Sequence, residues 1–176
     1  MMSPEWLRAS ARYNRWMNDK LYGLAATLGD EARKRDVGAF FKSIHGTFNH
    51  LLLADRVWLA RFDGVVSPPG CLAPGGIRSL DQELFADFED LRRERTLTDD
   101  ALTKFVSALT PERLAAPLVY DRFGEKHECP CWWAIAHLFN HQTHHRGQIT
   151  TLLTQRGHDP GVTDLFAMLR LEATPA

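Results

Sequence analysis

Apolar side chains recur at helical spacing along most of this chain, and that pattern constrains the fold more than any other feature. In the first segment they follow one another at intervals that repeatedly return to one face of a helix: Trp6, Tyr13, Trp16, Met17, Leu21 and Leu24. Ser3 followed by Pro4 is typical of a helix start, and Gly29 is typical of a helix end. We therefore expect an amphipathic helix over residues 4–28.

Two further long helices are expected in the middle of the chain. The segment 37–62 is apolar on more than one side, which predicts a central helix with His50 at least partly buried. Ser79 and Gln82 have the spacing of a capping box, so a third helix is predicted from there to Leu109. The intervening residues 65–76 are rich in proline and glycine and are expected to form a loop.

The last third of the chain begins with a break in the helical pattern. Residues 118–129 read as two short extended pieces around Phe123 and Gly124, which predicts a small hairpin. A fourth long helix is expected from Pro130 to Gly157, and a short C-terminal helix over 164–171.

Four long helices with little strand content predict an all-α fold, an antiparallel four-helix bundle with a short hairpin-like connection and a short C-terminal helix. The length of 176 residues suits one domain spanning residues 1–176. The long connections leave the order of the helices around the bundle open. The charged run at residues 90–100 is expected to be the solvated face of the third helix.

Charge and hydropathy narrow the classes of partner. The formal net charge of −1 provides no field that would attract phosphates or anionic lipid, so nucleic acid is not expected as a partner. The apolar runs are too short to span a bilayer and the N-terminus lacks the pattern of a signal peptide, so a cytoplasmic protein without membrane contact is expected. Cys71, Cys129 and Cys131 are expected to be reduced thiols.

Four of the eight histidines lie in HLFNHQTHHRGQ, residues 137–148. On a helix, His137, His141 and His145 form a column in which adjacent members could share one ion, whereas His144 lies on another flank. An adjacent pair supplies two ligands, so a third must come from another helix, and His50 is the best candidate. Three neutral imidazoles with an open position suit zinc, nickel or ferrous iron.

The other residues near these motifs allow less specific predictions of their roles. His45, His127 and His158 are expected at the surface or in packing rather than as ligands. Asp55 could bond to an imidazole or form an ordinary salt bridge. Gly147 could allow another helix to approach, Gln148 could bind a ligand or orient His144, and Arg146 is expected in an ion pair with an acidic residue of another helix or subunit.

Three segments together resemble the DinB family, also described as DinB/YfiT-like metalloenzymes. They are YNRWMNDKL at 13–21, HGTFNHLLLADRVWLARF at 45–62, and HLFNHQTHHRGQ at 137–148. The resemblance covers nearly the whole chain. It implies an up-down-down-up four-helix bundle, often a homodimer, in which three histidines hold a divalent metal, nickel or zinc.

Carried over residue by residue, the resemblance implies that His50, His141 and His145 are the metal ligands, with His137 and His144 near the pocket. Relatives include transferases and isomerases that use low-molecular-weight thiols, while many members have no assigned reaction. The expected function is therefore a divalent-metal-dependent enzyme that activates a thiol or water for a small-molecule substrate, with thiol transfer favoured. The alternatives are a metal-dependent hydrolase and a noncatalytic metal-binding stress-response module.

Overall fold

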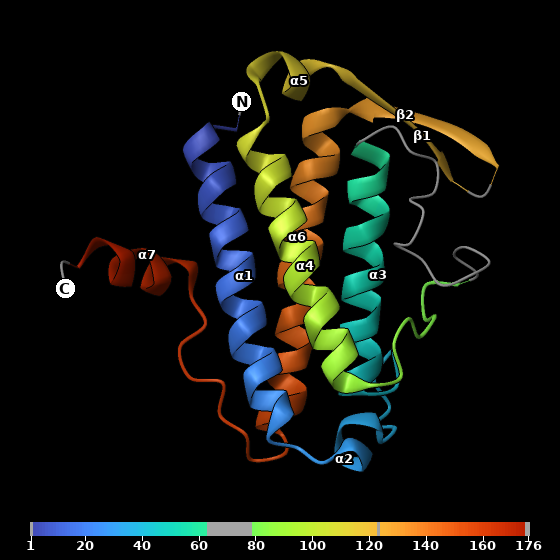
Figure 1. Cartoon of the computed structure of the whole chain (residues 1–176), viewed down its shortest axis with the longest axis vertical. Coiled ribbons are helices and arrows are strands. Elements are labelled where there is room, and N and C mark those ends of the chain that lie inside the picture. The colour runs from blue at the N-terminus through green and yellow to red at the C-terminus, as the bar shows by residue number, and fades with distance from the viewer. Residues whose placement is uncertain (1, 63–78, 123, 175–176) are drawn as a thin grey trace.

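The structure is a computed structural model that describes residues 2–62, 79–122 and 124–174. Its four long helices are α1 (Pro4–Ala26), α3 (Ile44–Phe62), α4 (Phe88–Ser107) and α6 (Cys131–Thr154). Around the bundle, α1 and α3 lie diagonally opposite each other, and each of them packs against both α4 and α6. The chain runs in one direction along α1 and α6 and in the other along α3 and α4 (Figure 1). The all-α fold and its up-down-down-up order are therefore confirmed.

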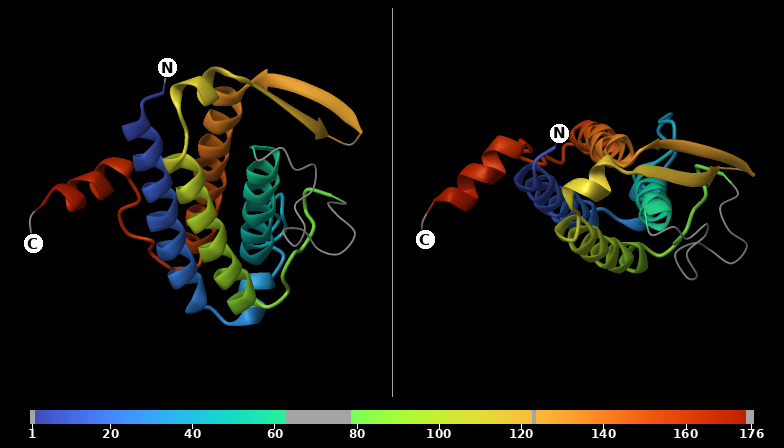
Figure 2. Two further views of the ribbon diagram at one scale, coloured as in Figure 1. Left: turned by 45° about the horizontal axis from the view of Figure 1, so that its top comes forward. Right: turned by 90° about the horizontal axis from the view of Figure 1, so that it is seen from above.

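Five short elements connect or extend the bundle. They are α2 (Asp30–Lys34), α5 (Pro111–Ala115), β1 (Pro117–Arg122), β2 (Glu125–Pro130) and α7 (Leu165–Ala173). The strands form the expected antiparallel hairpin, with Leu118 opposite Cys129 and Tyr120 opposite His127. The hairpin extends across the end of the bundle where α3 finishes, and α7 projects sideways from α1 (Figure 2).

The predicted ends of the first and fourth helices are confirmed to within a few residues. Ser3 Oγ accepts a hydrogen bond from Trp6 N at 3.1 Å, and Pro4 occupies the first helical position. At the end of α6, Gly157 has a left-handed φ of 79°, and the next amide, His158 N, donates to the Leu153 carbonyl. These bonds satisfy backbone groups that a helix end leaves without partners.

Two predicted helix starts are wrong. Residues 37–43 form a tight turn in which Lys42 has a φ of 65° and Val37 N donates to Lys42 O, so α3 begins only at Ile44. The capping box at Ser79 is not formed either. Instead α4 begins at Phe88, where the side chain of Asp87 caps the Asp90 amide at 2.9 Å. Apolar residues before both helices pack on the core as loops, which is why periodicity extended the helices too far.

The bundle core consists of two hydrophobic clusters, one toward each end. One contains Tyr22, Phe48 and Leu91, and the other contains Leu7, Leu102 and Leu138. Between them lies a layer of buried polar residues, which we call the polar layer: Asn14, Asn18, Asp55, Arg95, Asp99, Gln142 and Arg146. Each of the four long helices contributes to it.

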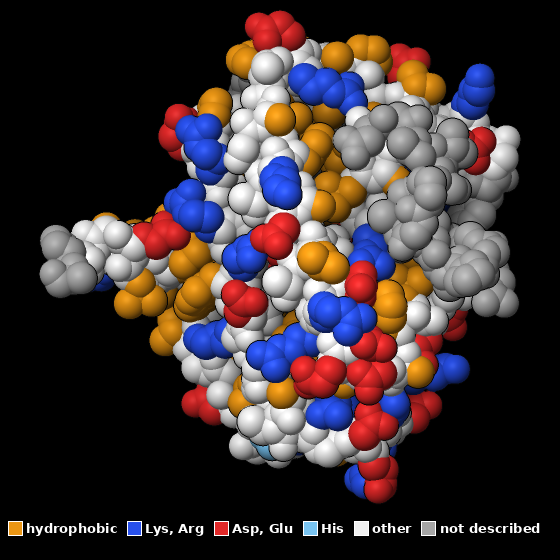
Figure 3. All heavy atoms as spheres, viewed as in Figure 1, with side chains coloured by type: hydrophobic (Ala, Val, Ile, Leu, Met, Phe, Trp, Pro, Cys, Tyr) orange, Lys and Arg blue, Asp and Glu red, His pale blue; other side chains and the backbone are white. Residues whose placement is uncertain are grey.

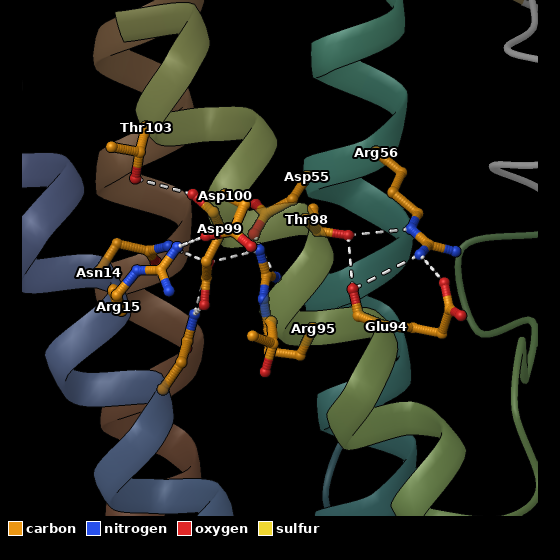
Figure 4. Close-up of polar contacts among 12 residues, drawn as sticks. Asn14, Arg15, Asp55, Arg56, Glu94, Arg95, Thr98, Asp99, Asp100 and Thr103 are labelled. Atoms are coloured by element: carbon orange, nitrogen blue, oxygen red, sulfur yellow. Dashed lines mark hydrogen bonds and ion pairs between the residues drawn. The ribbon is translucent and has the colours of Figure 1, made fainter. Parts of the chain in front are cut away.

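The polar layer corrects the expectation that residues 90–100 form only a solvated face. Arg95 and Asp99 are 2% exposed, and Arg95 bonds to Asp55 at 2.6 Å and to Asp99 at 2.7 Å (Figure 4). Arg92 and Arg93 on the same helix are exposed as expected. Buried charges are tolerated where they are paired, and pairing across helices cannot be read from the local charge pattern.

The outer surface agrees with the near-neutral composition. On the face formed by α1 and α4, acidic and basic side chains are interspersed (Figure 3). None of the helices in the described ranges is long and apolar enough to cross a membrane. The predicted loop 65–76 and Cys71 lie outside the described residues, as does Phe123 at the hairpin turn.

Candidate metal centre

Three histidines from two antiparallel helices meet beside the polar layer. His50 comes from α3, and His141 and His145 come from successive turns of α6. The Nε2 atom of His141 lies 3.1 Å from His50 Nε2 and 3.0 Å from His145 Nε2. We call this group the three-histidine centre. The structure thus brings together the three residues that the sequence singled out, and it could hold a metal ion.

In His50 and His145, the hydrogen bond made by Nδ1 determines that Nε2 is the nitrogen free to bind an ion. His50 Nδ1 lies 2.7 Å from the Leu80 carbonyl, which can only accept, so Nδ1 carries the hydrogen. His145 Nδ1 lies 2.7 Å from Gln148 Oε1 and donates in the same way. In each ring the Nε2 atom is then a lone-pair acceptor, and these atoms face His141.

The three imidazoles stay neutral at neutral pH, so additional protons do not supply hydrogen bonds between their Nε2 atoms. Burial, with repulsion from neighbouring imidazoles, lowers the pKa of His50 to about 4 and that of His141 to about 3. Burial also lowers the pKa of His145. A neutral His141 can donate one Nε2 hydrogen to only one of its two neighbours. The residues therefore fit a divalent cation, because three ring nitrogens converge, and two of the rings make the outward Nδ1 hydrogen bond that imidazole ligands adopt. The Nδ1 atom of His141 is buried and has no partner among the described residues.

The turn before α3 completes the wall of the centre. The ring of Phe41 stacks on His50 with centroids 3.8 Å apart and lies edge-on to His145 at 5.4 Å. Gly46 allows this approach, because a Cβ there would lie 2.2 Å from the Phe41 carbonyl oxygen. Sequence reasoning missed both residues, although a glycine early in a helical segment directly after His45 is a signal of close backbone approach.

The remaining histidines lie outside the centre. His137 is exposed, with its ring 5.6 Å from His141 and 5.3 Å from Trp58. His144 is exposed, and its Nε2 lies 3.3 Å from Gln148 Nε2. Gln148 thus contacts both His144, as considered from the sequence, and His145. His45 is buried against the Phe85 carbonyl and His127 stacks on Tyr120, as packing residues do.

The structure tests three other interpretations of the sequence, two of them for residues of the polar layer. Of the two roles considered for Asp55, the salt bridge is the one formed, with Arg95. Contrary to the expectation, Arg146 has no ion-pair partner among the described residues: it donates to Asn14 Oδ1 and lies 5.2 Å from the centre of the Tyr13 ring. Gly147 is exposed, and a Cβ there would have no neighbour within 4 Å among the described residues, so no described helix of this chain approaches it closely.

Comparison with known proteins places this architecture in a family. The sequence profile of the DinB family matches residues 2–175. Protein DinB of Bacillus subtilis (strain 168) is 26% identical over 165 residues, which cover 92% of each chain. The crystal structure of a DinB-like protein from Bacillus cereus ATCC 10987 superposes with a TM-score of 0.58 at 20% identity, over 84% of this chain and 91% of that one. The chain described here therefore belongs to the DinB family.

Proposed function

We propose that this protein is a divalent-metal-dependent enzyme that transfers a low-molecular-weight thiol to an electrophilic small molecule. The observation that carries the proposal is the convergence of three Nε2 atoms, in which His141 Nε2 lies 3.0–3.1 Å from the other two and a single hydrogen on it cannot satisfy both. His50, His141 and His145 would hold the ion, for which nickel and zinc are the candidates. When bound, the cation lowers the pKa of a thiol or water beside it.

The surroundings of the three-histidine centre favour a thiol over water. Among the described residues, no Asp or Glu hydrogen-bonds to the three imidazoles or joins their group of ligand atoms, so none of these carboxylates lies beside the proposed ion to take a proton from water. A thiol has a pKa near 8.5, far below that of water, and ionises without such a base. Leu80 and Gln148 fix the orientation of two imidazoles, and Phe41 excludes water from one side.

The reaction we propose is a nucleophilic substitution. The thiol loses its proton to solvent, and its sulfur attacks an electrophilic carbon of the substrate. A carbon–sulfur bond forms, and the bond from carbon to the leaving group breaks with the electron pair departing on that group. The chain supplies position and a water-poor wall, and these contributions require no side chain to act as an acid or base.

The same absence of a carboxylate supports a second candidate, a noncatalytic metal-binding module. A hydrolase is less well supported, for the reason given for water. We also expect a homodimer, on the grounds of the family, and sedimentation velocity of the purified protein will measure this directly.

The first experiment measures metal content. Purified protein is expected to bind one nickel or zinc ion, and His50→Ala, His141→Ala and His145→Ala are each expected to lose most of it. His127→Ala is the matched control, since His127 packs on the hairpin and should leave the metal content unchanged. Full metal retention by both α6 variants would contradict the proposal.

The second experiment separates enzyme from module. Metal-loaded protein is mixed with glutathione, bacillithiol or mycothiol and an activated aryl chloride, and release of chloride is followed. Turnover that disappears on chelation and in His141→Ala supports thiol transfer. Metal-dependent binding of a thiol without turnover of any electrophile would favour the module.

A further inference from the structure

A row of aromatic and basic side chains leads away from the three-histidine centre toward the hairpin. On α6, the ring of His137 lies one turn before His141, with 5.6 Å between their centroids. His137 contacts Trp58 of α3 at 5.3 Å, and Trp58 contacts Tyr120 of β1 at 5.5 Å. The exposed or half-buried rings form a continuous path from the proposed ion to the strands.

Arg61 lies at the far end of this row. The carbon at the centre of its guanidinium is 4.6 Å from the ring centroid of Trp58 and 4.6 Å from that of Tyr120. Across the described ranges, Arg61 makes no hydrogen bond or ion pair, whereas the buried Arg95 bonds to two carboxylates. Contact with ring faces uses none of the five N–H donors of a guanidinium, so these donors remain available to a ligand.

The two charged neighbours of Arg61, Arg122 and Asp121, have opposite signs, so the positive charge of Arg61 itself is what a ligand anion would meet. Burial, with repulsion from Arg122, lowers the pKa of Arg61, while Tyr120 and the carboxylate of Asp121 act in the opposite direction. A guanidinium remains protonated at neutral pH. The half-buried position strengthens a charge-assisted bond relative to one in bulk water. A planar guanidinium held by rings also presents two parallel N–H bonds, which match the oxygens of a carboxylate or a phosphate.

The spacing between the two features limits the size of the ligand. Trp58 lies eight residues after His50 on α3, a rise of roughly 12 Å along the helix. An extended peptide of about three to four residues covers the same distance. A compound that touches both features must therefore be elongated, with its anionic group far from its reacting atom.

We propose that Arg61, Trp58, Tyr120 and His137 form a subsite for the anionic end of the substrate, a carboxylate or phosphate, while its thiol lies at the three-histidine centre. This inference rests on the proposed function and specifies the class of thiol. Arg61 binds the anion, and the rings of Trp58 and His137 lie along the body of the compound. The residues of the subsite are positioning and specificity residues.

The test uses two matched pairs of thiols, each consisting of a carboxylate and the corresponding alcohol. Mercaptooctanoate and mercaptooctanol are long enough to reach Arg61, and mercaptopropionate and mercaptopropanol are not. Dissociation constants are measured by calorimetry with nickel-loaded full-length protein and with chelator-treated protein. Mercaptooctanoate is expected to bind about tenfold more tightly than mercaptooctanol, as one charged hydrogen bond allows, and the short pair to show no such preference.

Variants assign the preference to Arg61. In Arg61→Met the preference should disappear while the affinity for mercaptooctanol and the nickel content stay unchanged. Arg93→Met removes the same charge from an exposed position of α4, away from the subsite, and should keep the preference. If Arg61→Met does not fold, Arg61→Lys keeps the charge and stem without the planar fork, and its preference should fall below that of the wild type. A matching phosphonate thiol shows which anion is bound more tightly.

The possible failures are distinct. Nickel-dependent binding of the alcohols without a carboxylate preference, or with one that survives in Arg61→Met, would overturn the subsite and leave the proposed function intact. If no thiol binds in a nickel-dependent way, the proposed function is contradicted. The subsite is then judged with octanoate, which lacks a thiol: a shift of the Arg61 Nε–H signal in NMR spectra supports it, and an unchanged signal overturns it.

Discussion

The polar layer and the three-histidine centre adjoin each other along α6, yet they are built on opposite principles. Gln142 and Arg146 belong to the polar layer, and His141 and His145, each next to one of them in sequence, belong to the centre. In the polar layer donors meet acceptors: Arg95 joins Asp55 and Asp99, and Asn14 donates to Asp99 at 2.6 Å. In the centre three ring nitrogens converge, and at most one hydrogen, on His141 Nε2, lies among them.

This difference separates a structural cluster from a functional one. The polar layer carries two arginines and two aspartates, so its formal charges cancel within the chain. Burial alone would lower the pKa of Arg95, but the carboxylates of Asp99 and Asp55 raise it above its ordinary value, so the cation is stabilised where it lies. The centre has no opposite charge among its described neighbours, and the charge it needs must come from outside the chain.

The largest expected effect comes from breaking the polar layer. Arg95→Met leaves Asp55 and Asp99 buried without their cation, and removing one partner of a buried pair costs about 3–5 kcal/mol. Urea unfolding followed by circular dichroism measures the loss. Arg93→Met is the control, because Arg93 is exposed on the same helix and should change the free energy of unfolding by less than about 0.5 kcal/mol. Equal losses in the two variants would refute the distinction.

The second-largest expected effect is the gain in stability when a metal ion is added to the three-histidine centre. A ligand at one hundred times its dissociation constant adds about 2.7 kcal/mol to the stability of the state that binds it. Nickel or zinc should therefore raise the melting temperature of the wild type and of Arg93→Met, but not that of His141→Ala. In chelated protein, His141→Ala should melt close to the wild type, because His141 is only partly buried. A large loss there would mean that the imidazoles stabilise the fold without metal.

The centre was more predictable from the sequence than the polar layer. The spacing places His137, His141 and His145 on one side of a helix, the apolar surroundings of position 50 pointed to His50, and the family motif selected His141 and His145 from the column. The histidines form a local cluster on a recognisable helix, so one helical projection groups them. Only their partners Leu80, Gln148 and Phe41 required coordinates, because each reaches its imidazole through loop geometry or side-chain direction.

The polar layer shows what the sequence could not predict. Arg95 and Asp99 lie in a run where charged residues outnumber apolar ones, and local pattern assigns such a run to solvent. Their burial depends on Asp55, forty residues away, and on Asn14 and Asn18 of α1. Pairing of this kind depends on the register between helices, and the periodicity of a single helix contains no information about that register.

Substitutions of two glycines should change the stability of the protein in opposite directions, because one glycine lies beside the three-histidine centre and the other on an exposed face of α6. Gly46→Ala places a Cβ 2.2 Å from the Phe41 carbonyl, so the turn that covers His50 must shift, at a cost of about 1–3 kcal/mol. Gly147→Ala meets nothing within 4 Å on an exposed helical face and should stabilise the protein by about 0.5–1 kcal/mol. Thermal unfolding measures both. Metal affinity should weaken only in Gly46→Ala, and equal behaviour of the two variants would show that the turn does not support the centre.

The smallest effect comes from the outward hydrogen bond of one imidazole. Gln148 accepts from His145 Nδ1 at 2.7 Å and so keeps the Nε2 lone pair directed inward. Gln148→Leu should weaken nickel or zinc binding by about tenfold, since hydrogen-bond partners of a ligating imidazole are worth tenfold to a hundredfold in metal affinity. The stability of the metal-free protein should stay nearly unchanged.

Gln148→Glu is the control. It retains the acceptor and should bind the metal at least as tightly as the wild type, because a carboxylate makes the imidazole more basic. Competition with a chelator of known affinity gives the dissociation constants. If binding in Gln148→Glu is weakened as much as in Gln148→Leu, Gln148 fills space rather than orienting His145. The ring tautomer would then be fixed only at His50, by the Leu80 carbonyl.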